Sequence, residues 1–149
     1  MDLDKAALSR RVQELLSDIP RERQQLLPAL WRVFEEYWHL SPEMIDAIAQ
    51  TLDIPYADVY GVASFYALFA NPDNKKPIYI CTDVMCALYG SEDLLKAGED
   101  LANDAGVRVK EAPCLGHCDG APALFDGRQT IRHASPKVLA QIIRGETDA

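Results

Sequence analysis

CTDVMC spans residues 81–86 and CLGHCDGAP spans residues 114–122, and these two segments hold all four cysteines of the chain. Cys81 and Cys86 form one close pair, and Cys114 and Cys118 form another. Each pair follows a short run of residues that is typical of a β-strand. Because neighbouring strands can bring the two pairs to one point, we interpret the four cysteines as ligands of a metal or iron–sulfur site.

Other roles for the cysteines stay open at this stage. Structural disulfides need an oxidising compartment, but MDLDKAALSRRVQ (1–13) is charged from its second residue and lacks an apolar signal region. A zinc ribbon usually separates paired ligands by two residues, whereas the gaps here are four and three. A thioredoxin-type dithiol needs Cys-x-x-Cys, which does not occur in the sequence. Four inert buried thiols would seldom form two close pairs, and a [2Fe–2S] cluster suits the looser spacing.

Small and rigid residues surround the second cysteine pair. Gly116, Gly120 and Pro122 all lie in the segment CLGHCDGAP (114–122). Glycine allows the backbone to approach a bulky inorganic core and to take a positive φ. Backbone N–H groups exposed in this way can donate hydrogen bonds to cluster sulfurs. A plain glycine turn has a similar composition.

The two motifs, C-T-x-x-x-C-x-x-x-G-S-x-x-L and C-L-G-x-C-x-x-A-P-A, together resemble the thioredoxin-like [2Fe–2S] subunit of NADH-oxidising modules. This family includes the small peripheral-arm subunit of respiratory complex I, the matching subunit of NAD-linked hydrogenases and the gamma subunit of NAD-dependent formate dehydrogenases. The resemblance extends upstream through residues 26–69. It implies that the four cysteines bind a [2Fe–2S] cluster, and that FMN and NAD bind to a larger iron–sulfur partner subunit.

Within this family, GRQTIRHAS (127–135) and the short sequence after the last expected helix most resemble formate dehydrogenase gamma subunits. Complex I subunits more often carry acidic and tyrosine-rich sequence there. The resemblance therefore implies a non-catalytic electron-transfer subunit of a formate dehydrogenase, with the complex I or hydrogenase counterpart as the alternative. Two alternatives of other classes are a free-standing ferredoxin that forms a homodimer and a zinc-stabilised scaffold.

Composition limits the partners of the chain, which has 149 residues, 48% of them hydrophobic, and a formal net charge of −8. Residues 1–76 carry 8 basic and 12 acidic side chains, and residues 77–149 carry 7 and 11, so each half has a charge of −4. Nucleic-acid binding relies on clustered Lys and Arg, so it is not expected. No run approaches the roughly 20 apolar residues of a membrane span. We expect a soluble, cytoplasmic protein.

The first part of the chain, residues 1–70, is expected to be helical. The expected helices cover residues 4–19, 21–40, 41–52 and a short segment after Pro55. Pro28 is expected to kink the second helix or to start a new one, and Ser41-Pro42-Glu43 is typical of a helix start. Trp31 and Trp38 widen the apolar face of the second helix, which another helix or a partner subunit could cover.

A polar run over residues 71–76 is expected to be a linker to a second domain, residues 77–149. The expected strands and helices of that domain cover residues 78–80, 91–106, 107–112, 123–125, 128–132 and 135–145. Ser91 and Ser135 are expected to cap helices, Asp126-Gly127 predicts a type I′ hairpin turn, and both cysteine pairs are expected in loops. The order of strand, helix, three strands and helix suits a thioredoxin-like domain. The predicted fold class is therefore α+β.

Charged residues lie beside the expected ligands. Asp83 and Asp119 would disfavour reduction of a nearby cluster, and a protonated His117 would favour it. A Rieske centre uses two histidines with two cysteines, so we expect His117 to be an exposed loop residue and not a ligand. No G-x-G-x-x-G fingerprint follows a strand. His39 and His133 have no recognisable nucleophile nearby in the sequence, and no catalytic residue is assigned.

Overall fold

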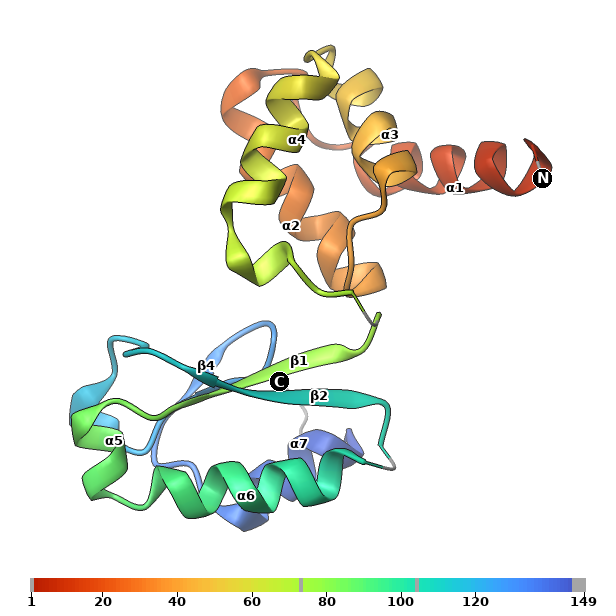
Figure 1. The fold of residues 1–149 in the computed structure, drawn as a ribbon. Coiled ribbons are helices and arrows are strands. Elements are labelled where there is room, and N and C mark those ends of the chain that lie inside the picture. The colour runs from red at the N-terminus through yellow and green to blue at the C-terminus, as the bar shows by residue number, and fades with distance from the viewer. Residues whose placement is uncertain (1, 73, 104, 146–149) are drawn as a thin grey trace. The chain divides into compact units, whose positions relative to one another are not determined.

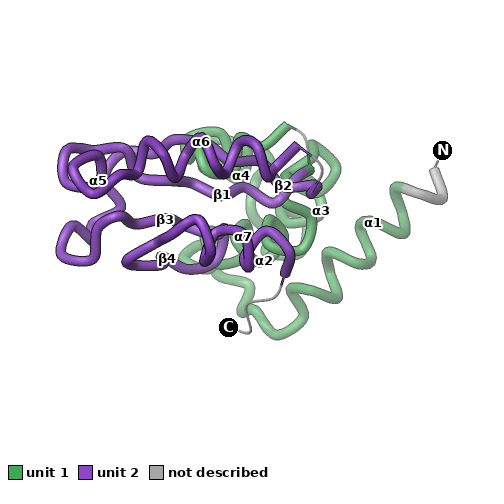
Figure 2. Tube along the Cα trace, turned by 90° about the horizontal axis from the view of Figure 1, so that it is seen from below, with its two compact units in different colours: residues 1–74 green, residues 75–149 purple. Residues whose placement is uncertain are grey.

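The computed structural model describes residues 2–72, 74–103 and 105–145 of the chain. It divides into two compact units, residues 1–74 and residues 75–149, which Figure 2 shows in different colours. In the described residues, unit 1 is helical and unit 2 contains a sheet with helices (Figure 1). The predicted α+β class is therefore confirmed.

Unit 1 is built from helices that follow one another closely. They are α1 (Asp2–Leu15), the 3₁₀ helix η1 (Arg23–Gln25), α2 (Leu26–Tyr37), α3 (Pro42–Leu52), α4 (Tyr56–Phe65) and the 3₁₀ helix η2 (Ala67–Phe69). Pro28 lies in the first turn of α2, where a backbone N–H has no helical acceptor, so it does not interrupt the helix. Ser41 caps α3 as expected, because its hydroxyl accepts a hydrogen bond from the N–H of Met44 at 3.3 Å.

Aromatic side chains form the centre of the core of unit 1. Phe34 is fully buried, and its ring centroid lies 6.1 Å from that of Trp31, 5.8 Å from that of Trp38 and 5.3 Å from that of Phe69. Trp31 and Trp38 are half-buried and pack against this core. The apolar face of α2 is thus covered mainly by residues of unit 1 itself.

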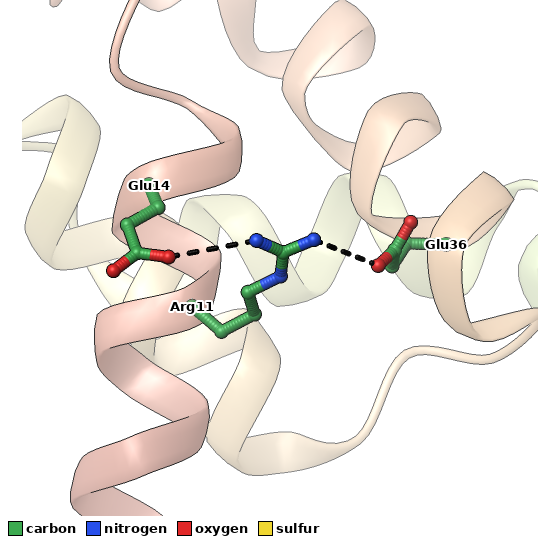
Figure 3. Close-up of polar contacts among 3 residues, drawn as sticks. All are labelled: Arg11, Glu14 and Glu36. Carbon is green, nitrogen blue, oxygen red and sulfur yellow. Dashed lines mark hydrogen bonds and ion pairs between the residues drawn. The ribbon is translucent and has the colours of Figure 1, made fainter.

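Arg11 links α1 to α2 on the surface of unit 1 (Figure 3). Its Nη1 atom lies 3.5 Å from Oε2 of Glu14, and its Nη2 atom donates a hydrogen bond to Oε1 of Glu36 at 3.2 Å. The hydrogen bond and charge of Glu36 raise the pKa of Arg11 above its usual value. All three side chains are exposed, so solvent screens these pairs and their contribution to stability is small.

Unit 2 contains a four-stranded sheet in the order β2-β1-β3-β4. Its elements are β1 (Lys76–Cys81), α5 (Val84–Leu88), α6 (Ser91–Ala102), β2 (Val107–Ala112), the 3₁₀ helix η3 (Cys118–Gly120), β3 (Leu124–Phe125), β4 (Thr130–Ile131) and α7 (Pro136–Arg144). β1 and β2 are parallel, and the other two pairs are antiparallel. The segment with α5 and α6 supplies the long connection that a parallel pair requires.

Two helices, α6 and α7, cover the same face of the sheet (Figure 1). Gly98 of α6 lies so close to Leu139 of α7 and Val109 of β2 that an added Cβ would be 3.0 Å from both side chains. Ser135 caps α7 as expected, since its hydroxyl accepts from the N–H of Val138 at 3.3 Å. No helix in the described ranges combines the length and the apolar character that crossing a membrane would require.

The prediction that Ser91 caps a helix is wrong. Gly90, with φ of 84°, occupies the N-cap position of α6, and Ser91 is the first helical residue. The hydroxyl of Ser91 is fully buried and finds no hydrogen-bond partner among the described residues. Glycine takes the cap position because the chain needs a left-handed residue between α5 and α6.

The expected type I′ turn at Asp126-Gly127 is also wrong. Phe125 and Thr130 pair across the hairpin, which leaves four residues in the loop, and Gly127 has φ of 94° whereas Asp126 does not have a positive φ. The carboxylate of Asp126 is buried and accepts the N–H groups of Arg128 and Gln129, both at 2.8 Å. The side chain of Asp126 therefore organises the loop in place of a tight backbone turn.

Candidate functional site

The pairing of β1 with β2 brings the two cysteine pairs together. Cys81 is the last residue of β1 and lies opposite Ala112, the last residue of β2, and Cys114 follows two residues later. The N–H of Cys81 donates to the carbonyl of Ala123 at 3.0 Å, and the N–H of Thr82 donates to that of Ala112 at 3.1 Å. The carboxyl ends of two parallel strands thus carry the first cysteine of each pair at one edge of the sheet.

All four cysteines line one pocket of about 120 Å³, the cysteine pocket, together with Asp83, Val84 and Met85. Cys81 and Cys86 are each only 2% exposed, whereas Cys114 and Cys118 are exposed. One pair therefore forms the buried floor of the pocket, and the other pair lies at its solvent side.

The prediction that both cysteine pairs lie in loops holds only for Cys114. Cys81 is the last residue of β1, Cys118 is the first residue of η3, and Cys86 lies within α5. The helix forms there because the carboxylate of Asp83 accepts a hydrogen bond from the N–H of Val84 at 2.8 Å, which caps its first turn. The only buried residue of α5 is Cys86. This short helix therefore buries Cys86 at the pocket, whereas Val84, Met85 and Leu88 stay exposed to solvent.

The second pair is held close by its loop. The Sγ atoms of Cys114 and Cys118 are 3.3 Å apart, and the N–H of Gly116 donates to Sγ of Cys114 at 3.4 Å. Gly116 has φ of 78°, a conformation that favours glycine. The glycines of this motif had led us to expect backbone N–H groups that donate to sulfur, and Gly116 makes such a contact with Cys114.

The protein environment favours protonated thiols while no metal is bound. Burial is the main cause that raises the pKa of Cys86, and the hydrogen bond with Cys114 is the main cause that raises the pKa of Cys118. Metal ligation requires thiolates, so a bound metal centre must displace these protons.

Arg132 fixes the loop that carries Cys118. Its guanidinium pairs with the carboxylate of Asp119, and its side chain lies directly against Gly120. The backbone adds two contacts, because the N–H of His133 donates to the carbonyl of Gly120 at 2.7 Å and that of Ala134 donates to Pro122 at 2.8 Å. Asp119 thus has a cationic partner, which offsets the effect on reduction expected from its charge.

The profile of the family described as thioredoxin-like [2Fe-2S] ferredoxin matches residues 12–146 of the chain. The chain belongs to this family. The E subunit of the NADH-quinone oxidoreductase of Aquifex aeolicus is 29% identical over 145 residues, which cover 91% of each chain. The HndA subunit of the NADP-reducing hydrogenase of Solidesulfovibrio fructosivorans is 26% identical and covers 91% of this chain and 85% of its own. The second E subunit of the NADH-quinone oxidoreductase of Rhizobium meliloti is 32% identical over 72% of this chain and 70% of its own.

The donor set of the cysteine pocket fits the [2Fe–2S] cluster of this family. Four sulfurs line the pocket in two pairs, and each iron of such a cluster takes two protein thiolates. A zinc site needs its ligands around one point, so the paired arrangement suits a two-iron cluster better than one ion.

The histidines lie outside the lining of the cysteine pocket. His117 lies in the loop before η3, at its N-cap, as expected, but it is half-buried and not fully exposed. His39 is half-buried with Nδ1 at 3.1 Å from the carbonyl of Tyr37, and His133 is exposed. The sequence interpretation did not identify Val84 and Met85 as pocket residues, although Asp83 followed by apolar residues is a signal for a capped helix.

Replacing Gly120 with Ala is expected to destabilise unit 2. The new Cβ would lie 2.7 Å from Cβ and 2.9 Å from Cγ of Arg132, so the loop or the hairpin must move. We expect a loss of about 1–3 kcal/mol in the free energy of unfolding, measured by chemical denaturation.

Gly61→Ala is the matched control for Gly120→Ala. Gly61 lies in α4, and an added Cβ there would meet no atom within 4 Å. Since alanine favours the helix, this variant should gain about 0.5–1 kcal/mol. Equal effects of the two substitutions would contradict the close packing of Gly120 against Arg132.

Thiol alkylation of the reduced, iron-free chain should follow burial. Cys114 and Cys118 are exposed and should react with iodoacetamide first, whereas Cys81 and Cys86 are 2% exposed and should react last. Mass spectrometry of timed samples gives the order, and early labelling of Cys86 would contradict the buried floor of the pocket.

Proposed function

We propose that this chain is a one-electron carrier that binds a [2Fe–2S] cluster through Cys81, Cys86, Cys114 and Cys118. It would act beside a larger subunit that binds FMN and NAD(H). The observation that supports this most directly is the pocket lined by four cysteines in two pairs. Its membership of the thioredoxin-like [2Fe-2S] ferredoxin family supports the same cofactor.

The residues of the chain have distinct tasks in this proposal. Cys81 and Cys86 ligate from the buried side of the pocket, Cys114 ligates from the loop after β2, and Cys118 ligates from η3. The N–H of Gly116 supplies a hydrogen bond to the sulfur of Cys114, which is one means of tuning a reduction potential. A cluster bound there supplies transfer of single electrons without an obligatory proton.

The relatives and the free thiols support a proposal for the partner and the location. The relatives are named as subunits of NADH-quinone oxidoreductase and of an NADP-reducing hydrogenase, so we propose that this chain also works as one subunit of a larger complex. We propose a cytoplasmic location, consistent with thiols that remain free of disulfides in the described residues. The chain itself would contribute no catalytic residue.

Anaerobic purification followed by metal analysis and spectroscopy tests the cofactor. We expect about two irons per chain with matching sulfide, and an S = 1/2 EPR signal that appears when dithionite reduces the chain. A colourless protein with one zinc, or one without metal after anaerobic handling, would return the cysteines to a structural role.

For the parent complex we propose the gamma subunit of an NAD-dependent formate dehydrogenase. The support is the resemblance of GRQTIRHAS (127–135) to such subunits, whereas the relatives above belong to other NAD(P)H-linked complexes. Purification of a tagged copy from its native cells decides between them. Formate-dependent reduction of NAD by the purified complex supports the proposal, and quinone- or hydrogen-linked activity without it would contradict it.

A further inference from the structure

The helix α5 exposes its apolar residues beside the cysteine pocket. Val84 is 70% exposed, Leu88 is 75% exposed and Tyr89, which follows the helix, is 63% exposed, while Met85 is 40% exposed. A short helix on a soluble protein would normally bury such residues, and contiguous exposed apolar surface marks an interaction site. These four residues are called the α5 patch.

The α5 patch lies directly against the candidate cofactor site. Val84 and Met85 line the cysteine pocket together with the four cysteines. A protein that covers the α5 patch would therefore rest against the wall of that pocket. This places the patch where an electron-transfer partner must approach.

An acidic groove lies next to the α5 patch. It has a volume of about 510 Å³ and is lined by Thr82, Asp83, Glu111, Ala112 and Pro113, at the carboxyl ends of β1 and β2. Asp83 lines both this groove and the cysteine pocket. Asp83 and Glu111 are exposed, and neither forms an ion pair with a Lys, Arg or His in the described part of the chain. Asp119, by contrast, pairs with Arg132.

We propose that the α5 patch and the acidic groove together bind the flavin-containing partner, and that the partner presents an apolar surface bordered by a Lys or Arg. This inference rests on the proposed function, because it assigns the partner of the same site. The cation would enter the groove between Asp83 and Glu111, while the apolar surface covers Val84 and Leu88. Charge complementarity of this kind sets the orientation and the rate of association.

The charges argue against a second copy of the chain as the occupant. A two-fold interface places the same surface on both sides, so Asp83 and Glu111 of one copy would approach those of the other. Each copy also carries a formal net charge of −8. Like charges brought together across an interface are unfavourable. An anionic membrane surface or nucleic acid is unsuited for the same reason.

The test uses the iron-loaded chain and mitochondrial cytochrome c, a basic redox protein, as the probe. The chain is reduced, freed of dithionite and mixed with oxidised cytochrome c at several salt concentrations in a stopped-flow instrument. For the wild-type chain we expect the rate of electron transfer to fall as salt rises. Glu111→Gln should lower the rate at low salt by roughly threefold and flatten its salt dependence, because it removes one charge of the acidic groove. Glu111 lies outside the cysteine pocket, so this variant should still bind the cluster.

Matched variants on α6 show whether a change in rate comes from the proposed surface or from any loss of charge or apolar surface on the chain. Glu99→Gln makes the same charge change on an exposed residue, and Leu101→Asn is the counterpart of Leu88→Asn. Leu88→Asn should lower the rate at all salt concentrations, and both α6 variants should behave as wild type. Equal behaviour of Glu111→Gln and Glu99→Gln, or of the two Leu variants, would overturn the inference.

Two further measurements keep the inference separate from the proposed function. Iron content and the EPR signal are determined for every variant before the kinetics. A wild-type chain without iron overturns the proposed function and this inference with it, whereas loaded variants with equal rates overturn the inference alone.

Light scattering gives the oligomeric state. A wild-type dimer that Leu88→Asn converts to a monomer would show that the α5 patch binds a second copy, against the proposal.

Discussion

Replacing Cys86 with Ser is expected to remove most of the iron and sulfide that the chain binds under anaerobic conditions. Cys86 lines the cysteine pocket from within α5 and is only 2% exposed. Serine preserves the size of the side chain, but its hydroxyl deprotonates far less readily than a thiol and is a harder donor for iron. Iron and sulfide analysis, together with the EPR signal after reduction, measures the loss.

A second ligand variant and a control variant test this result. Cys118→Ser changes an exposed ligand candidate and should cause the same loss with less disturbance of packing. His117→Ala changes the neighbouring residue, which does not line the pocket, so it should retain the full iron content and at most shift the reduction potential. Full iron and sulfide in Cys86→Ser would refute the ligand assignment, and loss of half the iron in His117→Ala would show that the histidine is a ligand.

The sequence predicted best those elements whose signals are local. The expected strand over residues 107–112 has the same bounds as β2, and the caps at Ser41 and Ser135 form as expected. In each case the residues that specify the element are its own. Ser91 was misjudged because a serine before two acidic residues looks like a cap, whereas the tight connection from α5 requires Gly90 at that position.

The surroundings of the cysteines were harder to predict because they depend on residues distant in the sequence. The structure gathers the four predicted cysteines at one pocket, but the pairing of Arg132 with Asp119 joins segments that no local pattern connects. Helix α5 has five residues, too few for a periodic pattern, so its exposed apolar side chains were not expected. The effect of Asp119 on reduction could not be judged from its sequence position alone.

Replacing Phe34 with Ala is expected to destabilise unit 1 by about 3–5 kcal/mol. Phe34 is fully buried, and its ring lies against those of Trp31, Trp38 and Phe69, so its removal leaves a cavity that the neighbouring aromatic rings cannot fill. Both tryptophans of the chain lie in unit 1. Tryptophan fluorescence during chemical denaturation therefore reports the unfolding of this unit, and the midpoint should move to lower denaturant.

The visible absorption of the bound cluster would report unit 2 in the same experiment, because all four cysteines lie there. Leu139 is fully buried in the separate core of unit 2, so Leu139→Ala is the matched control, with an expected loss of about 2–5 kcal/mol. If the two cores fold independently, Phe34→Ala shifts only the fluorescence transition and Leu139→Ala shifts only the loss of visible absorption. Coincident shifts of both signals in either variant would show that the units unfold as one, and would contradict the division into two domains at residues 71–76.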